Sequence, residues 1–413
     1  MVETAAGGNS TGVHMSAMKK LFQIMADKKA SDIFVSIGAP INIKINGVAI
    51  PVNQATMTAD TVQQLLYEVL NERQIREFEE EMELNTAYNL AGVGTFRISA
   101  FRQKGSPSVV VRYIPGTIPS IDSLGVPEVL KEVIMGKRGL ILMVGATGSG
   151  KSTSLASMLD YRNERKSGHI LTLEDPVEYV FQNKKSIVNQ REIGTDTKAF
   201  EIALKNALRQ APDCILIGEI RDKPTMSMAL AYAQSGHLCL ATLHANNSYH
   251  AMNRIINFYP LENRPALLLD LSAALSAVIS QRLVRTKTGA RVAAVEVLLN
   301  TRHISELIER GEIGEIKEAL EKSMSPGSQT FEQALFKLFM DGKITQDEAM
   351  ANADSATNML WLINQATAGE ITGQSMPQSM PQVAAKPAEE EKKEGLLSGS
   401  GASFGNFKID VNA

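Results

Sequence analysis

Apolar and polar positions alternate in short stretches over the first 115 residues of the chain. Apolar and polar residues alternate in the segment SDIFVSIGAPINIKINGVAIPV, residues 31–52, and Gly and Pro interrupt the alternation. This pattern predicts strands joined by turns. Residues 95–115 predict a two-stranded hairpin that turns near Gly105. Two further stretches have apolar residues at helical spacing: 17–26 and 58–83. The pattern therefore predicts a mixed α/β domain over residues 17–115.

A run of turn-forming residues, PGTIPS at 115–120, ends this pattern, and a different one begins near residue 123. Four nearly unbroken apolar runs follow: LILMV, HILTL, CILIGEI and LCLATLH. Longer segments with helical spacing separate them. Strands that are apolar on both faces and joined by helices are typical of a parallel sheet. We therefore predict a linker at 116–122 and a parallel α/β domain at 123–300.

The two ends of the chain have different compositions from this domain. Residues 301–366 keep a helical pattern. Residues 1–16 are small and polar, and residues 367–413 contain QSMPQSMPQ, KPAEEEKKEG and a Gly/Ser stretch. Such segments cannot bury enough apolar surface to offset the entropy of ordering, so we predict a disordered leader and a disordered tail.

The most apolar helical candidate covers residues 266–284. Polar residues interrupt it at Asp270, Gln281 and Arg282, so we do not expect it to span a membrane. The first 16 residues lack the apolar core of a secretion signal.

Composition narrows the class of protein further. The formal net charge is −3, so no overall excess of Lys and Arg points to nucleic acid. The two cysteines, Cys214 and Cys239, lie inside apolar runs, which favours reduced, buried thiols in a cytosolic protein. Two cysteines are also too few for a four-cysteine zinc site.

The strongest chemical signal is the segment GATGSGKST. It follows an apolar strand and begins a helical run, the context that a phosphate-binding loop requires. Glycines let backbone N–H groups face a phosphate, Lys151 reaches the outer phosphates, and the Ser152 hydroxyl ligates Mg²⁺. The predicted cofactors are ATP and Mg²⁺. The predicted nucleotide-binding residues of the loop are Gly145, Ala146, Thr147, Gly148, Ser149, Gly150, Lys151, Ser152 and Thr153.

Two acidic residues end later strands. Glu174 follows HILTL, and Glu219 belongs to CILIGEI. Ligands of open parallel sheets bind beyond the carboxyl ends of the strands, so both carboxylates are catalytic candidates. We assign Glu174 to orienting the attacking water and Glu219 to the magnesium shell, and these roles could be exchanged. For Glu178 and Glu192, a structural role is at least as well supported.

Three of the six histidines lie in GHLCLATLHANNSYH: His237, His244 and His250. Catalysis, metal binding and an ordinary interior position are all compatible with this clustering. The spacing of seven between His237 and His244 is not a helical metal motif, which makes zinc the weaker alternative. His250 stays unassigned.

Four motifs in order and spacing, GATGSGKST, LTLEDPVEY, LRQAPDCILIGEIRD and GHLCLATLHANNS, resemble those of the secretion ATPase superfamily. The segments SDIFVSIGAPINIKING and QTFEQALFKLFMDGKIT narrow the resemblance to type IV pilus retraction ATPases, over about residues 18–365. The resemblance implies a hexameric ring, a PAS-like mixed α/β N-terminal domain and a RecA-like P-loop C-terminal domain with a helical C-terminal part and a disordered tail.

The same resemblance implies roles for four residues. His237 and His244 would lie near the nucleotide and register its γ-phosphate. Arg97 and Arg112 match arginines that reach the nucleotide of the neighbouring subunit, so we predict a catalytic role for both. Forked guanidinium donors suit phosphate oxygens. The alternative is surface pairing with the acidic run near Glu79, which is better supported for Arg102.

Departures from the family pattern suggest a specialised member. Phe34 stands where the family usually has His, and the helical segment at 302–320 differs from the usual AIRNLIREGK. With the long tail, these features resemble accessory retraction motors. The implied partners are a homo-hexamer, a companion retraction ATPase and an inner-membrane pilus platform protein. The implied location is the cytoplasmic face of the inner membrane, with peripheral association through partners and no nucleic acid.

Two other functions remain open from the sequence. A DNA-translocating RecA-like ATPase would share the loop and the acidic strand ends, but should also show a basic stripe or stacking aromatics, and aromatics are only 5% here. A nucleotide-binding adaptor without turnover would bind ATP and act through a partner motor.

Overall fold

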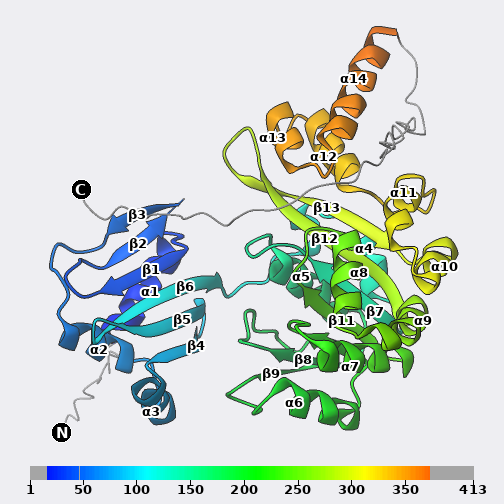
Figure 1. The fold of residues 1–413 in the computed structure, drawn as a ribbon. Helices are drawn as coiled ribbons and strands as arrows, with labels where there is room; N and C mark the ends of the chain where they lie inside the picture. The colour runs from blue at the N-terminus through cyan, green and yellow to red at the C-terminus, as the bar shows by residue number, and fades with distance from the viewer. Residues whose placement is uncertain (1–15, 46, 373–413) are drawn as a thin grey trace, which may run out of the picture. The chain divides into compact units, whose positions relative to one another are not determined.

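The computed structural model describes residues 16–45 and 47–372 (Figure 1). A six-stranded sheet forms the N-terminal part, in the order β3-β2-β1-β6-β5-β4, and its neighbouring strands all pair antiparallel. The strands are β1 (Asp32–Ser36), β2 (Asn42–Ile45), β3 (Val48–Pro51), β4 (Glu83–Leu90), β5 (Gly94–Gln103) and β6 (Ser106–Pro115). The hairpin predicted for residues 95–115 is confirmed as β5 and β6, which turn at Lys104 and Gly105, both at positive φ.

Three helices accompany this sheet: α1 (Ala17–Asp27), α2 (Ala59–Tyr67) and α3 (Glu72–Glu81). The helix predicted at 17–26 is confirmed by α1. The single helical stretch predicted at 58–83 is wrong in its middle, because α2 and α3 are separate. Asn71 begins α3 with a capping box, in which its side chain and that of Gln74 each accept from the other's backbone N–H.

A seven-stranded sheet forms the C-terminal part, in the order β13-β12-β7-β11-β10-β8-β9. All neighbours pair parallel except β12 with β13. The strands are β7 (Gly139–Val144), β8 (Gly168–Glu174), β9 (Ser186–Glu192), β10 (Cys214–Ile217), β11 (Leu238–Leu243), β12 (Leu275–Arg285) and β13 (Arg291–Leu299). The four apolar runs of the sequence are β7, β8, β10 and β11, so the predicted parallel sheet is confirmed.

Helices cover both faces of this sheet: α4 (Val129–Ile134), α5 (Lys151–Arg165), α6 (Phe200–Ala207), α7 (Lys223–Gln234), α8 (Ser248–Asn257) and α9 (Arg264–Ala274). Every residue of β7 is buried, and alternate side chains enter two different cores. Ile141 and Met143 pack with Met158 of α5, whereas Leu142 packs with Met252 of α8. This two-sided burial explains why the strand shows no polar alternation, and it leaves the carboxyl edge of the sheet open for chemistry.

The prediction of one helix over residues 266–284 is wrong. Helix α9 ends at Ala274, and β12 begins at Leu275 and lies between β7 and β13. A short apolar segment fits a buried strand as well as a helix, and here the place between two other strands decides the outcome. Among residues 16–45 and 47–372, no helix has both the length and the apolar character needed to cross a bilayer.

The C-terminal part of the described chain is helical, as predicted: α10 (Arg302–Arg310), α11 (Ile316–Glu321), α12 (Phe331–Met340), α13 (Gln346–Asn352) and α14 (Ala356–Thr372). Phe331 and Leu335 of α12 pack against Val284 and Ala294 of the β12–β13 pair. Helix α14 continues beyond the predicted end at 366 and is described as far as Thr372. The disorder predicted for residues 1–15 and 373–413 lies outside the described residues.

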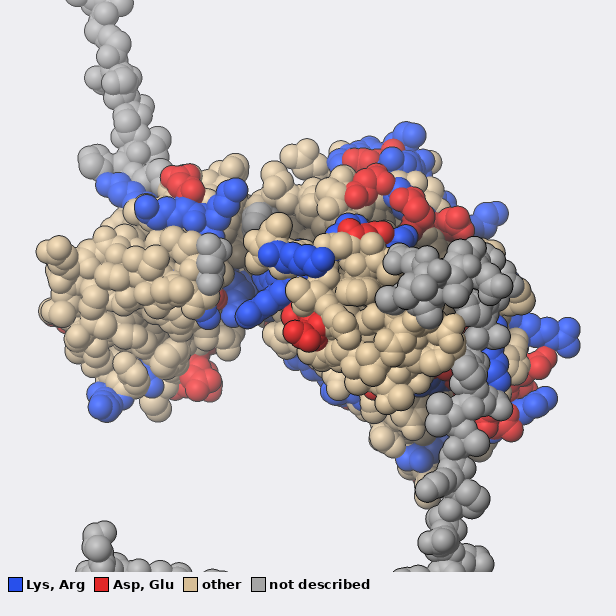
Figure 2. Space-filling model, turned by 90° about the horizontal axis from the view of Figure 1, so that it is seen from above, with Lys and Arg blue, Asp and Glu red and all other residues tan. Residues whose placement is uncertain are grey.

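Charged side chains of both signs occur together on the surface. On the face drawn in Figure 2, basic and acidic side chains are interspersed over the C-terminal part, at the right of the picture.

Candidate nucleotide-binding site

The predicted phosphate loop connects β7 to α5. Three of its residues, Gly145, Gly148 and Gly150, have positive φ values. A Cβ on Gly150 would lie 2.7 Å from Nε2 of Gln281, so this position excludes side chains by contact as well as by conformation. Helix α5 begins at Lys151, and its free N–H groups open toward the loop.

Polar atoms inside the loop fit an anionic ligand. The Lys151 Nζ donates to the carbonyl oxygens of Gly145, at 2.7 Å, and Ala146, at 2.9 Å. Burial lowers the pKa of Lys151, an effect that Glu219 and Glu178 oppose. Ser149 Oγ is buried and has no hydrogen-bond partner among the described residues. A buried hydroxyl without a partner is costly, and a phosphate oxygen would satisfy it.

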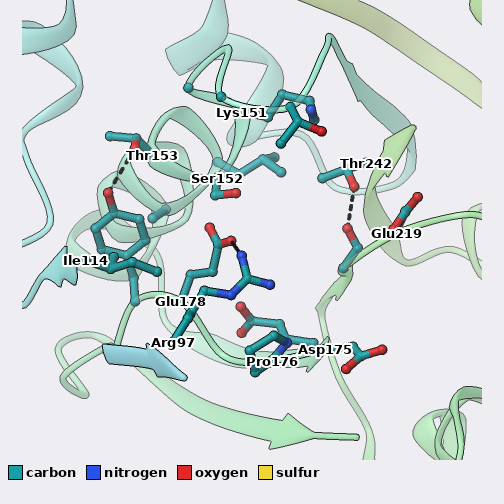
Figure 3. Close-up of a pocket in the computed structure, with 18 of the residues that line it drawn as sticks. Arg97, Ile114, Lys151, Ser152, Thr153, Asp175, Pro176, Glu178, Glu219 and Thr242 are labelled. Atoms are coloured by element: carbon teal, nitrogen blue, oxygen red, sulfur yellow. Dashed lines mark hydrogen bonds and ion pairs between the residues drawn. The ribbon is translucent and has the colours of Figure 1, made fainter. Parts of the chain in front are cut away.

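Ser152 and Thr153 follow on the first turn of α5. In Figure 3, the Ser152 hydroxyl faces the cavity, as a magnesium ligand must. The Thr153 hydroxyl is instead hydrogen-bonded to the Tyr179 hydroxyl at 2.8 Å. Thr153 would therefore contact the nucleotide through its backbone rather than through a free side chain.

Glu174 ends β8 and is almost completely buried. Its Oε1 accepts from Thr172 Oγ1 at 2.6 Å and from Gln190 Nε2 at 3.2 Å. Burial raises the pKa of Glu174, although both hydrogen bonds act to lower it. A backbone hydrogen bond from Glu178 also lowers the pKa of this carboxyl, yet burial prevails, and a carboxylate in such a position can accept a further hydrogen bond from water.

Glu219 follows β10 and lies beside the cationic Arg221 and the ionisable His244. Arg221 Nε donates to its Oε2 at 2.7 Å, and His244 Nε2 lies 3.5 Å from its Oε1. Burial and the charge of Lys151 lower the pKa of His244, which favours the neutral ring, while Glu219 and a backbone hydrogen bond with Gly145 act in the opposite direction. Thr242 Oγ1 donates to the Gly218 carbonyl and ties β11 to the loop that carries Glu219.

The two predicted nucleotide-sensing histidines lie at opposite ends of β11. His244 follows the strand and lines the cavity. His237 precedes the strand, where its Nδ1 lies 3.0 Å from Ser235 Oγ, and it does not line the cavity. Six strand residues separate the two by about 20 Å, since a strand rises about 3.3 Å per residue. The structure therefore does not bring His237 to the nucleotide site.

Arg97 and Arg112 are direct cross-strand partners in β5 and β6. Like charges in this register repel unless anions compensate them. Arg97 Nη1 contacts Glu178 Oε1 at 2.6 Å, and Arg112 Nε contacts Asp32 Oδ1 at 3.0 Å. Both arginines line the cavity of their own chain, whereas the family resemblance implies that they serve the neighbouring subunit.

The surface pair with the acidic run is formed by a different arginine. Arg102 Nη2 contacts Glu79 Oε2 at 2.6 Å, so the alternative weighed for Arg97 and Arg112 applies to Arg102 alone.

Lys151, Glu174, Glu219 and His244 line one cavity of about 570 Å³. In Figure 3, Ser152 and the Arg97–Glu178 pair face the same space, with Glu219 at its edge. The volume falls in the range of small-molecule and cofactor sites. Among the described residues, no group of three or more His, Cys, Asp or Glu side chains lies close enough to hold a metal ion. Ser152 and Glu219 are therefore the candidates that would share Mg²⁺ with phosphate oxygens.

Sequence reasoning missed one residue that holds the loop in place. Gln281 on β12 is buried, donates from Nε2 to the Ser149 carbonyl at 2.9 Å, and accepts from Ser154 Oγ at 2.7 Å. In the sequence it was visible only as a polar interruption of an apolar stretch.

The site combines a glycine-rich loop between a parallel strand and a helix, a lysine at the first helical residue, and carboxylates at neighbouring strand ends. These features define a P-loop nucleotide-binding protein. The sequence model of the type II/IV secretion system protein family matches residues 9–350, and the chain belongs to this family.

Relatives of known name cover most of the chain. The type IV pilus ATPase PilU of Pseudomonas aeruginosa is 47% identical over 346 residues, which are 84% of this chain and 91% of that protein. The type IV pilus retraction ATPase PilT of the same organism is 39% identical over 339 residues, 82% of this chain and 98% of that protein.

Solved structures agree with these relatives. The crystal structure of the pilus retraction motor PilT with bound ADP has a TM-score of 0.78 and 38% identity, over 84% of this chain and all of that one. The ATPase DotB of Legionella pneumophila has a TM-score of 0.70 and 27% identity, over 80% of this chain and 93% of that one. The predicted fold class is confirmed: an antiparallel-sheet N-terminal domain precedes a parallel-rich P-loop domain.

Proposed function

We propose that this chain is an ATP-hydrolysing motor that powers type IV pilus retraction as an accessory to a companion retraction ATPase. One observation carries the enzymatic part of the proposal. Lys151, Glu174, Glu219 and His244 come from four separate elements and line a single cavity. Relatives named as pilus ATPases over more than four fifths of the chain support the biological part.

The residues divide the work of ATP hydrolysis. The loop N–H groups and Lys151 bind the β- and γ-phosphates, and Ser149 Oγ gains the partner that it lacks. Mg²⁺, held by Ser152 and Glu219 with phosphate oxygens, would neutralise charge that develops on the phosphates. Glu174 orients the attacking water through its carboxylate. Neutral His244 donates toward the γ-phosphate and, through its proximity to Glu219, responds to whether that phosphate is present.

Arg97 adds charge from the N-terminal sheet. Because Glu178 already accepts from Arg97 within the same chain, we assign Arg97 to the nucleotide of its own subunit. Arg112, its cross-strand partner, is the more exposed of the two and supports it. Nucleotide phosphates would compete with Glu178 for the Arg97 guanidinium.

Similarity to the same relatives supports a proposal for the assembly and location. We propose a homo-hexamer that acts with an inner-membrane pilus platform protein at the cytoplasmic face of the inner membrane. The proposed organisation is a leader at 1–16, a PAS-like domain at 17–115, a linker at 116–122, a RecA-like domain at 123–300, a helical part from 301 and a tail. Helix α14 supports a helical part that reaches at least Thr372.

The surface charges and the buried Glu174 favour this function over the two alternatives. On the face drawn in Figure 2, the interspersed charges of the C-terminal part give a nucleic-acid strand less attraction than a stripe of one sign would. An adaptor without turnover has no need of a buried Glu174 with a raised pKa beside the phosphate loop.

Turnover of the purified full chain tests the proposal. We expect magnesium-dependent ATP hydrolysis that single-stranded DNA leaves unchanged and that the companion retraction ATPase increases. Nucleotide binding without hydrolysis, alone and with the companion, would support the adaptor. Stimulation by DNA would support the translocase.

A further inference from the structure

Strand β12 carries polar side chains on three successive residues near its carboxyl end: Ser280, Gln281 and Arg282. Successive residues of a strand point to opposite faces of the sheet. Gln281 faces α5 and holds the phosphate loop, as described above. Ser280 and Arg282 face the other side, where the loop after His244 lies.

Arg282 joins that loop to the helical C-terminal part. Its Nη2 donates to the Asn246 carbonyl at 3.1 Å and pairs with Asp354, and its Nη1 donates to the Asn352 carbonyl. The guanidinium also lies over the Phe331 ring, 3.9 Å from its centroid. One side chain thus contacts the loop of residues 244–247, the end of α13 and the start of α12.

Asp354 contacts the same loop directly. Its Oδ2 accepts from Asn247 Nδ2 at 2.6 Å, while its other oxygen pairs with Arg282. The Asn247 side chain in turn caps α8 by accepting from the His250 N–H at 2.9 Å. Both charged side chains are largely buried, so the pair is screened by water less than a surface pair is.

A second buried carboxyl fixes the beginning of α8 on the same face. Glu296 Oε1 accepts from the Ser248 N–H at 2.7 Å and from Ser280 Oγ at 3.0 Å. Burial raises the pKa of Glu296. The loop between His244 and α8 is therefore held from β12, from β13 and from the loop between α13 and α14.

We propose that Arg282 and Asp354 are positioning residues that align His244 with the γ-phosphate and transmit the occupancy of the site to the helical part α12–α14. Neither residue lines the nucleotide cavity, so both act through the loop 244–247. The proposal rests on the proposed ATPase function, because it takes His244 as the contact to the γ-phosphate.

In this arrangement, two adjacent residues affect different parameters: Arg282 affects kcat, and Gln281 affects the affinity for nucleotide. Removing Arg282 should leave the phosphate loop intact, because Gln281 still holds it. We therefore expect Arg282→Met to lower kcat by about 10- to 100-fold through misalignment, with the dissociation constant of a fluorescent ATP analogue within about twofold of that of the unchanged protein. Gln281→Leu should weaken binding of the analogue instead.

Three variants of the full-length protein sharpen the test. Asp354→Ala should reproduce Arg282→Met, and the double variant should lose no more activity than either single variant, as for residues that act as a unit. Arg282→Lys keeps the charge but not the fork, so kcat should recover in part. Arg285→Met changes an exposed arginine on the same strand and is the matched control, expected to behave like the unchanged protein.

Amide hydrogen exchange provides a readout that is independent of hydrolysis. In the unchanged protein, a non-hydrolysable ATP analogue should slow exchange in α5 and also in residues 352–358. In Arg282→Met, α5 should still respond and residues 352–358 should not. Melting temperature and assembly size confirm that each variant folds.

The two proposals fail in different ways. If the protein without substitutions does not hydrolyse ATP, this result contradicts the proposed function but leaves the exchange test valid. An active protein in which residues 352–358 respond equally with and without Arg282, or in which Arg282→Met loses affinity as much as kcat, overturns the coupling proposed here.

Discussion

The two sheets of this chain carry their chemistry at different places along their strands. In the seven-stranded sheet, the phosphate loop, Glu174, Glu219 and His244 all lie at or just beyond the carboxyl ends of parallel strands. In the six-stranded antiparallel sheet, the proposed site residues Arg97 and Arg112 lie in mid-strand and oppose each other. The carboxyl ends of parallel strands lie along one edge because of the sheet topology. A residue in the middle of a strand instead contacts whatever packs on its face of the sheet.

This difference decides how securely each group can be assigned to its site. Residues at the ends of parallel strands must lie along one edge, so their proximity follows once the strands are identified. An arginine on an antiparallel face can meet its own chain, another subunit or solvent. The Arg97–Glu178 contact selects the first of these for the isolated chain. Each of the following predictions tests one side of the comparison.

The largest effect is expected at the loop. Lys151→Ala should abolish ATP turnover, because backbone N–H groups alone cannot neutralise the outer phosphates. Steady-state phosphate release measures it. Lys185→Ala, which changes an exposed lysine, is the control. Near-normal turnover in Lys151→Ala would remove this lysine from the site.

The arginines of the antiparallel sheet should come next. Arg97→Ala/Arg112→Ala should lower kcat by about 10³-fold or more, as for other arginines that stabilise transferring phosphoryl groups. Mixed with Lys151→Ala subunits, this variant should regain no activity, because both arginines act in their own subunit. A mixture of unchanged and Lys151→Ala subunits shows whether the assembly tolerates inactive sites. If it does, recovery in the first mixture means that the arginines act on the neighbouring subunit.

The two carboxylates should differ in stability rather than in activity. Glu174→Gln and Glu219→Gln should each reduce turnover by about 10²-fold, the lower end for general acid–base groups, with nucleotide binding still measurable. Glu174→Gln should also raise the melting temperature at neutral pH. The pKa of Glu174 is raised in the folded state, so its ionised form destabilises the fold.

The pH dependence of that stabilisation has a defined sign. The gain should be complete above the folded-state pKa of Glu174 and should disappear as the pH falls below the unfolded value of about 4.3. Glu219→Gln, which breaks the ion pair with Arg221, should give no such gain. Thermal unfolding of both variants between pH 4 and 8 compares them, and equal behaviour would show that burial of Glu174 has no energetic consequence.

A smaller shift is expected in the activity profile. Gln190 donates to Glu174 and lowers the pKa of that carboxyl, so Gln190→Leu should raise it further. The acidic limb of kcat/KM should then move to higher pH, since Glu174 must be ionised to orient water. Gln182→Leu, at an exposed position, is the control. An unmoved limb would assign the acidic group to another residue.

The smallest effect is expected from the tail. Truncation after Thr372 retains all of α14 and should leave turnover and melting temperature unchanged, because residues 373–413 have little periodic apolar surface. A large fall in melting temperature would mean that these residues pack against the folded part.

The sequence predicted the loop, Glu174 and Glu219 because local motifs and strand-end topology locate them. It did not predict that His237 lies at the opposite end of β11 from His244, because a shared motif does not say that a full strand separates its two ends. It also missed Gln281 and Arg282, which act on segments more than 30 residues away. Long-range polar contacts of this kind depend on register, and register is set by the assembled sheet.

The hydrogen bonds of Lys151 to the Gly145 and Ala146 carbonyls bear on how the cycle ends. When ADP and phosphate depart, the buried ammonium does not lose all its partners, since two carbonyl oxygens accept from it at once. Emptying the site is therefore easier than it would be if the cation were left bare. For a motor that must discharge its nucleotide at every step, this resting position favours fast product release at the expense of tight binding.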